Sequence, residues 1–325
     1  MIKLLKPSGY NIIKSNLIHN GVLSEKYIVV DNGIIKDIKD SATGFLDLSD
    51  YIMSAPFCDY HVHFTRAISP ADVYSKFLRY GINSVWDGGD RHLSGVIAKK
   101  ELAAFMDIKT SGYAIYKENG YGGYIGKAIK TPKEIIPVLE LGIDFIKIVN
   151  SGIFMPKTAK ISKGGFTFSE LKETVALCKG AGFAVHCHAN GDNAVKDAVV
   201  AGVSTIIHGF FITGDTIKLM AQKGVSIIPT VNALMSIPET DNKKNILEAV
   251  KLHLEVINKC VEEGVKVLVG SDSGASFLPY GEAFINELKL LAKAGLSVEQ
   301  VLHGATVMDL KATMKADFIL LEKTW

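Results

Sequence analysis

From about residue 51 onward, short apolar runs alternate with longer segments in which apolar residues recur at helical spacing. We interpret eight of the apolar runs as strands: YIMSAPFCDYHVHF, INSVWDGG, SGYAIYK, DFIKIVN, FAVHCHA, VSTIIHG, VSIIPTV and VKVLVGSD. Helical patterns lie between them at 70–80, 95–106, 132–141, 169–180, 192–201, 214–223, 243–263 and 281–294. This alternation predicts βαβ units and a parallel sheet.

The number of units indicates how that sheet closes. Eight βα units in roughly 250 residues are typical of an α/β protein with a (β/α)8 TIM barrel. A doubly wound open sheet is the alternative, although no GxGxxG motif follows the first strand. Glycine follows four of the helical patterns, in RYGINSV, ELGIDFI, GAGFAVH and EEGVKVL, where it suits a helix C-terminus that turns into a strand.

Residues 1–50 show a different pattern of short strands. YNIIKSNLIHN, KYIVVDNGIIKDIKD and GFLDLSD each have strand character, and DNG at 31–33 predicts a hairpin turn. The C-terminal segment MKADFILLEKTW adds one more strand. We therefore expect a small β-domain made of residues 1–50 and 312–325, and a barrel over residues 51–311.

Composition narrows the function classes. The 325 residues are 48% hydrophobic and 22% charged, with a net charge of +2 and no dense basic stripe, so neither nucleic acid nor a polyanion is an expected partner. The four cysteines form no CxxC pair, and MIKLLKPSGY is too short an apolar stretch for a signal peptide. No run approaches the roughly 18 apolar residues of a membrane helix. We expect a cytoplasmic protein that acts on a small molecule, with homo-oligomerisation left open.

Polar side chains gather where these strands end. The residues are His61 and His63, Lys147, His186 and His188, His208, and Asp272. In a barrel, functional residues lie at the C-terminal ends of strands. Strand residues two apart point to the same face, so both histidines of an HxH pair can converge on one ion. Neutral imidazoles bind Zn²⁺, Fe²⁺ or Mn²⁺, and the pattern predicts a metal site.

Lys147 is unusual among these residues because it ends the apolar run DFIKIVN. A buried ammonium is costly unless it is paired. Either CO₂ converts its amine to a carbamate, an anionic oxygen ligand that can bridge two metals, or the ammonium forms a salt bridge with Asp144 or Asp272. The residues alone leave both readings open.

Five segments together, DYHVH, FIKIV, VHCHANGD, IIHG and VGSDSG, resemble the amidohydrolase superfamily, in particular the binuclear branch with imidazolonepropionase-related and prolidase-like hydrolases. The resemblance implies that His61, His63 and Asp272 bind one metal, that carboxylated Lys147 bridges, and that His188 and His208 bind the second. Proximity to the NGD sequence favours His188 over His186, which we expect to be a packed, hydrogen-bonded core residue. APFCD before the HxH pair and a short C-terminal tail depart from the family pattern, which implies a reduced β-domain.

This resemblance implies hydrolysis of a C–N amide bond in a cyclic, N-acyl or dipeptide-like substrate. A hydroxide shared by two divalent ions, Zn²⁺ foremost, would attack, with Asp272 as general base and then acid. The alternatives are a mononuclear deaminase, a lactone or phosphoester hydrolase, and a non-catalytic scaffold. HANGD lacks the glutamate of the deaminase branch.

Three segments after strands are candidates for substrate contacts. Tyr121 and Tyr124 lie in the glycine-rich segment 116–126, and Arg91 and His92 follow WDGGD. The insertion 150–168 is long enough for a lid. Its lysines, Lys157, Lys160 and Lys163, either attract an anionic substrate or are simply solvated. Surface placement is the alternative for each of these residues.

Overall fold

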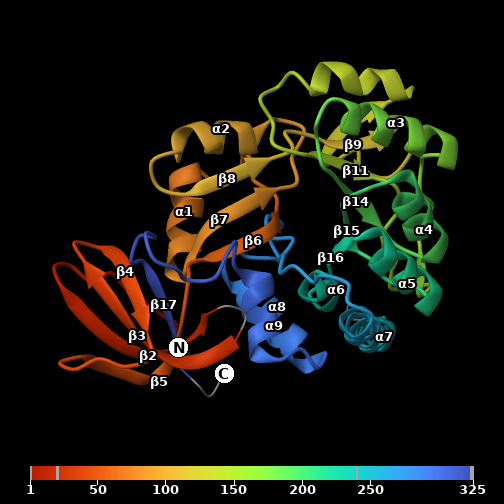
Figure 1. Cartoon of the computed structure of the whole chain (residues 1–325). Coiled ribbons are helices and arrows are strands. Elements are labelled where there is room, and N and C mark those ends of the chain that lie inside the picture. The colour runs from red at the N-terminus through yellow and green to blue at the C-terminus, as the bar shows by residue number, and fades with distance from the viewer. Residues whose placement is uncertain (1, 20–21, 239–240, 323–325) are drawn as a thin grey trace.

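The computed structural model describes residues 2–19, 22–238 and 241–322, which fold into a mixed α/β structure (Figure 1). One sheet, drawn red to orange with a blue strand, lies at one end of the molecule. Its six strands run in the order β1-β17-β5-β2-β3-β4. Their bounds are Ile2–Leu5 (β1), Asn11–His19 (β2), Val22–Asp31 (β3), Ile34–Lys39 (β4), Leu46–Ser54 (β5) and Phe318–Glu322 (β17).

This sheet contains the hairpin that DNG predicted. Strands β3 and β4 are antiparallel, and the turn between them holds Asn32 and Gly33 at φ values of 50° and 73°. Positive φ at both central residues is what a tight hairpin turn of this kind requires. The C-terminal strand β17 pairs with β1 and β5, so the two ends of the described chain share one sheet.

The predicted first strand, 51–64, is wrong as a single element. Strand β5 ends at Ser54 in the six-stranded sheet, and β6 (Phe57–Val62) begins three residues later in another sheet. Pro56 lies between them and has no backbone N–H for a strand ladder. The six-stranded sheet therefore extends beyond residue 50.

The parallel strands form two further sheets. One has the order β6-β7-β8, and the other has the order β10-β9-β11-β14-β15-β16. Apart from β6, their bounds are Ile82–Asp87 (β7), Asp107–Thr110 (β8), Ala114–Lys117 (β9), Gly126–Ile129 (β10), Ile146–Val149 (β11), Val185–Ala189 (β14), Thr205–His208 (β15) and Ser226–Ile228 (β16).

These strands do not form a closed barrel in the part of the chain that the structure describes. The predicted third strand, 111–117, is shorter in the structure, where β9 begins at Ala114 and pairs with β11. Strand β8, which was not predicted, precedes it and pairs with β7. The predicted eighth strand at 265–272 makes isolated backbone contacts instead of a ladder. Leu268 N donates to Ile227 O at 2.8 Å, and Asp272 N donates to His61 O at 2.8 Å. This segment therefore lies between β16 and β6.

Helices follow most of the parallel strands, with bounds Pro70–Arg79 (α1), Ser94–Glu101 (α2), Phe168–Gly180 (α3), Asp192–Ala201 (α4), Gly214–Lys223 (α5), Val231–Met235 (α6), Lys243–Glu262 (α7), Glu282–Lys293 (α8) and Val298–Ala305 (α9). The pattern at 132–141 forms a 3₁₀ helix, Pro132–Val138, with Pro137 inside it. The helix predicted at 95–106 ends at Glu101. The short helix α6 and the last helix α9 were not predicted.

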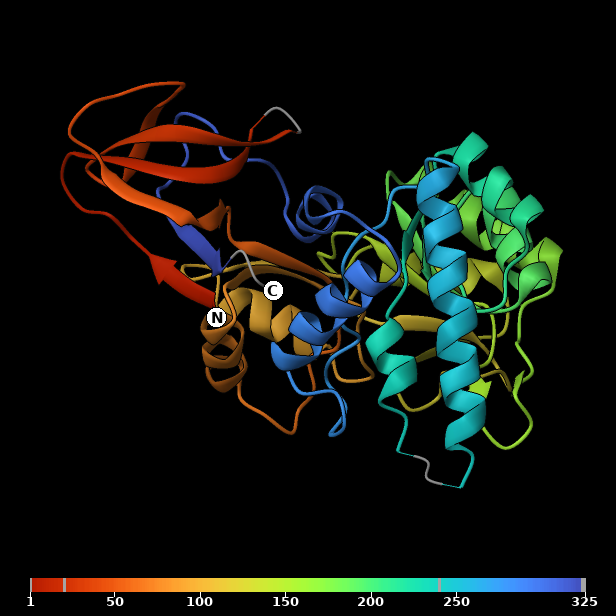
Figure 2. The same cartoon turned by 90° about the horizontal axis from the view of Figure 1, so that it is seen from below.

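Helices α8 and α9 lie between the sheet that contains β1 to β5 and helices α6 and α7, as both views show (Figure 2). Helices α4 and α5 cover the outer side of β14 and β15. A small hairpin, β12 (Phe154–Met155) and β13 (Lys160–Ile161), follows β11. No described helix has both the length and the apolar character needed to cross a bilayer.

The glycines predicted to end helices have the required conformation. Gly81 follows α1 at a φ of 76°, and Gly264 follows α7 at a φ of 79°. Both values lie in the left-handed region that ends a helix and is readily adopted by glycine. These turns send the chain back toward β7 and toward segment 265–272, and so fix where the next functional side chains emerge.

Candidate metal centre

One cavity of about 670 Å³ collects the side chains that the sequence singled out. The six predicted metal-binding residues, His61, His63, Lys147, His188, His208 and Asp272, all line it. Arg91, His92, Tyr121 and Tyr124, the predicted substrate contacts, line it as well. The carboxyl ends of β6, β11, β14 and β15 therefore meet at a single site.

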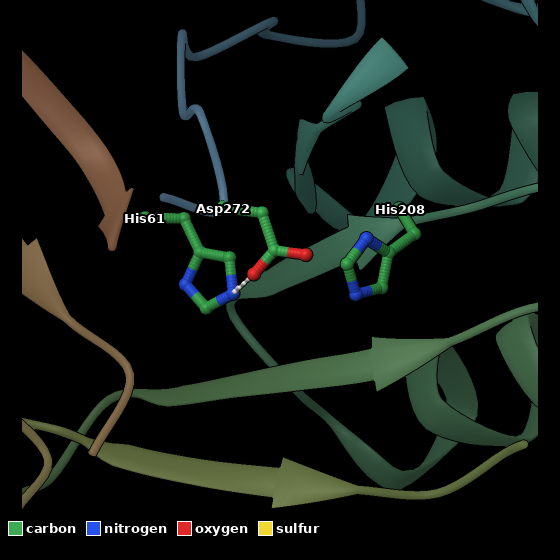
Figure 3. Close-up of side chains that lie close together, drawn as sticks. All are labelled: His61, His208 and Asp272. Carbon is green, nitrogen blue, oxygen red and sulfur yellow. Dashed lines mark ion pairs between the residues drawn. The ribbon is translucent and has the colours of Figure 1, made fainter. Parts of the chain in front are cut away.

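His61 and Asp272, both in the lining of this cavity, point toward one another (Figure 3). His61 Nε2 is 3.3 Å from Asp272 Oδ1, and His63 Nε2 is 3.5 Å from the same oxygen. His208 approaches from the other side of the carboxylate. Ligand atoms of His61, His208 and Asp272 all lie within 4.8 Å of one another, close enough to share one cation.

Burial and the carboxylate set the charges of this group. Burial is the main cause that holds the pKa of His61 and that of His208 well below the ordinary value. Burial alone would raise the pKa of Asp272, but hydrogen bonds from His61 and His63 hold it well below its usual range. His63 differs, because Asp272 raises its pKa against the effect of burial. The site thus combines the neutral imidazoles of His61 and His208 with an ionised carboxylate, a donor set for a divalent cation.

Three histidines each have one ring nitrogen occupied by a fixed partner. His63 Nδ1 lies 2.7 Å from Gly89 O, His188 Nε2 lies 3.0 Å from Gly152 O, and His208 Nδ1 lies 2.6 Å from the Thr230 hydroxyl. Such bonds fix the ring orientation and leave the second nitrogen to bind a metal. The arrangement fits a metal centre.

Lys147 lies in this group without a carboxylate partner. Its Nζ is 3.2 Å from His61 Nε2, and its side chain is 1% exposed. Asp144, one partner considered from the sequence, pairs with Lys99 at 2.6 Å instead. Neither Asp144 nor Asp272 comes within ion-pair distance of Lys147 in the described structure. Burial lowers the pKa of the amine to about 8.

His186 is packed in the core, as expected. Its ring stacks on Trp86 with centroids 5.1 Å apart and lies 4.6 Å from the ring of Phe145. The expected hydrogen bond is absent at Nδ1, which has no partner among the described residues. Burial lowers the pKa of this ring to about 3. His188, two residues later, is the member of the pair that faces the cavity.

The substrate-side candidates line the cavity and are at least partly exposed to solvent. The Tyr121 ring lies 5.6 Å from the ring of His188, and its hydroxyl contacts that of Tyr124. Arg91 donates to the carbonyl oxygens of Gly123 and Tyr124, which ties its loop to the tyrosine loop. The lysines of the predicted lid, Lys157, Lys160 and Lys163, are not among the residues that line the cavity.

Sequence reasoning missed several supporting residues. Asp59 accepts hydrogen bonds from Ser271 N and Oγ, which ties β6 to the segment that carries Asp272. Asp87 accepts from Phe64 N and Thr110 Oγ1 and so holds the chain just after His63. Both aspartates are strand residues within segments already quoted, APFCD and WDGGD, and that position was the available signal.

Comparisons with known proteins find one family model and several solved structures that match most of this chain. The amidohydrolase family model matches residues 52–312. A Xaa-Pro dipeptidase structure with bound methionine superposes with a TM-score of 0.78 at 21% identity, covering 97% of this chain and 94% of that one. A putative prolidase from Bifidobacterium longum gives 0.79 at 21% identity, covering 97% and 89%. The ochratoxinase of A. niger gives 0.77 at 17% identity, covering 98% and 90%.

Similarity at the sequence level is more limited. An uncharacterized protein of Mycobacterium tuberculosis (strain ATCC 25618 / H37Rv) is 26% identical over 143 residues. That match covers 42% of this chain and 38% of the relative, so the chain matches well under half of the relative's length.

Proposed function

This chain belongs to the amidohydrolase family, and on that premise we propose that it is a metal-dependent hydrolase of C–N amide bonds. Two divalent cations, Zn²⁺ foremost with Fe²⁺ or Mn²⁺ as alternatives, would be held by His61, His63, Lys147, His188, His208 and Asp272. The observation that carries the proposal is that these six side chains line one cavity.

The assignment of ligands to two cations follows the resemblance to the amidohydrolase family, and the distances support it. His61, His63 and Asp272 would hold one cation, since both imidazole Nε2 atoms lie within 3.5 Å of one Asp272 oxygen. His188 and His208 would hold the other, with ring centroids 4.5 Å apart. The bonds to Gly152 O and Thr230 Oγ1 leave one nitrogen free on each ring.

Lys147 would serve as a carboxylated lysine. A buried ammonium without a carboxylate partner is costly, and the described contacts give Lys147 only an imidazole neighbour. Reaction of the neutral amine with CO₂ forms an N–C bond and releases a proton, which leaves an anionic carbamate. Its oxygens would be ligands of the kind that divalent cations accept, between the two groups of histidines.

Asp272 is the residue that would move the proton. When bound, the metal ions would polarise the amide carbonyl and lower the pKa of a water molecule. The Asp272 carboxylate, kept ionised by its two histidine neighbours, can accept a proton from water and deliver it to the leaving nitrogen. The backbone bond from Asp272 N to His61 O fixes the carboxylate beside the ligands.

The cavity suggests the kind of substrate. A volume of about 670 Å³ is within the usual range for small-molecule sites. Its walls include apolar side chains such as Phe154, Leu234 and Phe277. An N-acyl amino acid, a dipeptide-like amide or a cyclic amide with an apolar group fits this lining. Arg91, His92, Tyr121 and Tyr124 would contact it.

The domain division also remains a proposal. The parallel strands, with segment 265–272 between β16 and β6, would be the part of this chain that corresponds to a (β/α)8 barrel. The sheet of β1 to β5 would be the small β-domain, completed by the C-terminal strand β17. Because β5 belongs to that sheet up to Ser54, the boundary is better placed near residue 55 than at residue 50.

Metal analysis and kinetics test the proposal together. We expect purified protein to retain close to two divalent ions per chain by plasma emission and to hydrolyse a member of a panel of N-acyl amino acids, dipeptides and cyclic amides. Asp272→Asn should keep the fold but lower turnover by about 100- to 10,000-fold, the usual contribution of general acid–base catalysis.

Asp37→Asn is the matched control, because this exposed aspartate lies on β4, in the sheet formed by β1 to β5 and β17. It should leave turnover unchanged. Near-normal turnover in Asp272→Asn would contradict the proton-transfer role. Full activity in metal-free protein would contradict the proposed function as a whole.

A further inference from the structure

The short helix α6 connects two parts of the site. Thr230, the residue before it, bonds to His208 Nδ1 through its hydroxyl. Ala233 and Leu234, within the helix, line the cavity. The placement of α6 therefore determines both the orientation of a proposed ligand and the shape of the apolar wall.

The start of this helix is strained. Thr230 has a φ of 50° and is fully buried. A β-branched residue rarely adopts this left-handed conformation. Strained conformations persist only where the surrounding contacts hold them, and α6 has no side-chain N-cap bond of its own. Some other group must therefore secure the beginning of the helix.

Glu287, on α8, supplies that contact. Its Oε1 accepts a hydrogen bond from Val231 N at 2.9 Å, and its Oε2 accepts one from Asn232 N at 2.6 Å. The side chain is 0% exposed. Burial raises the pKa of this carboxyl to about 8, although both backbone bonds lower it. Burying a carboxyl group costs free energy unless hydrogen bonds compensate it. For Glu287 the compensating bonds are those that hold the backbone at the start of α6.

We propose that Glu287 is a positioning residue that holds the start of α6, so that Thr230 orients His208 and Leu234 keeps its place in the cavity wall. The inference rests on the proposed function, because it takes His208 to be a metal ligand. Glu287 does not line the cavity and would act only through α6.

Hydrogen exchange and zinc affinity test this role. Glu287→Gln keeps the side-chain volume but turns an NH₂ group toward a backbone N–H. We expect the amides of Val231 and Asn232 to exchange about tenfold faster, the size expected for losing one buried hydrogen bond. Zinc affinity, measured by chelator competition, should fall about tenfold, as for loss of a group that orients a ligand. Glu282→Gln, exposed on the same helix, should change neither.

A second variant separates positioning from general destabilisation. Thr230→Ser keeps the hydroxyl and removes the β-branch, so it lowers the strain that Glu287 would hold in place. In that background, Glu287→Gln should cost less zinc affinity than in the wild-type chain. An equal cost would overturn the proposal.

Unchanged exchange at α6 would also overturn it, as would faster exchange spread evenly over the whole chain. If the wild-type protein binds none of Zn²⁺, Fe²⁺ and Mn²⁺, the proposed function fails. The exchange rates at Val231 and Asn232 still decide the positioning role in that case.

Discussion

A methyl group at Gly88 would meet both histidines of the HxH pair. A Cβ built there lies 2.6 Å from His61 Cε1 and 2.8 Å from His63 Cε1. Ordinary carbon contacts begin near 3.5 Å, so in Gly88→Ala the His61 ring must withdraw by about 0.9 Å. Metal–ligand distances tolerate only about 0.2 Å. The φ of Gly88 is not in the left-handed region, so the effect of this substitution is purely steric.

We therefore expect Gly88→Ala to lose most of its metal and about 100-fold in kcat/KM, the cost of roughly 1 Å of misplacement. Overpacking should lower the free energy of unfolding by about 1–3 kcal/mol. Gly180→Ala is the control, because no atom lies within 4 Å of its added Cβ at the end of α3. Metal content by plasma emission, amide hydrolysis and urea unfolding would be measured on both variants. Wild-type metal content and turnover in Gly88→Ala would refute the placement of His61 and His63 as ligands.

Two further predictions concern neighbouring buried groups. Thr230→Val removes the hydroxyl at His208 Nδ1 and should weaken zinc binding by about 10- to 100-fold in chelator competition. Thr230→Ser keeps the hydroxyl and should not weaken it. Equal zinc affinities in the wild-type chain and both variants would show that the hydroxyl does not orient the ring. Burial lowers the pKa of His253 to about 4. The stability from this neutral ring is complete above its unfolded pKa of about 6.5 and is lost as pH falls toward 4, by about 2 kcal/mol at pH 5. His253→Gln should therefore show a smaller loss of urea stability from pH 7 to pH 5, and an unchanged loss would contradict the assignment.

The composition of the site was predictable because its residues carry a local signal. His61 and His63 follow one another at a spacing of two in an apolar run, and Lys147 is a cation in another such run. Parallel strands bring their carboxyl ends to one edge, which converts separate positions in the sequence into one cavity. The structure places all of them around that cavity, while their roles as ligands stay predictions.

The connections between strands were less predictable, because contacts distant in sequence decide them. The run 51–64 looks continuous in its apolar character, yet Pro56 divides it between two sheets. The run at 265–272 has strand composition, but it makes isolated backbone bonds, two to β16 and two to β6, instead of a ladder. Glu287 gives no local sign that its carboxylate reaches Val231, 56 residues earlier in the chain.

The site also contains backbone conformations that local rules disfavour. His208, Thr230 and Asp272 have φ values of 73°, 50° and 57°. Each stands where a buried strand or extended segment ends, and each turns the chain at the cavity. Glycine would adopt these turns without strain, but it would remove an imidazole, a hydroxyl or a carboxylate from the site. The chain thus accepts strain at three points where the side chain is needed, and contacts such as the two Glu287 hydrogen bonds must hold that strain in place. The supporting contacts are therefore as much a part of the proposed metal centre as the ligands themselves.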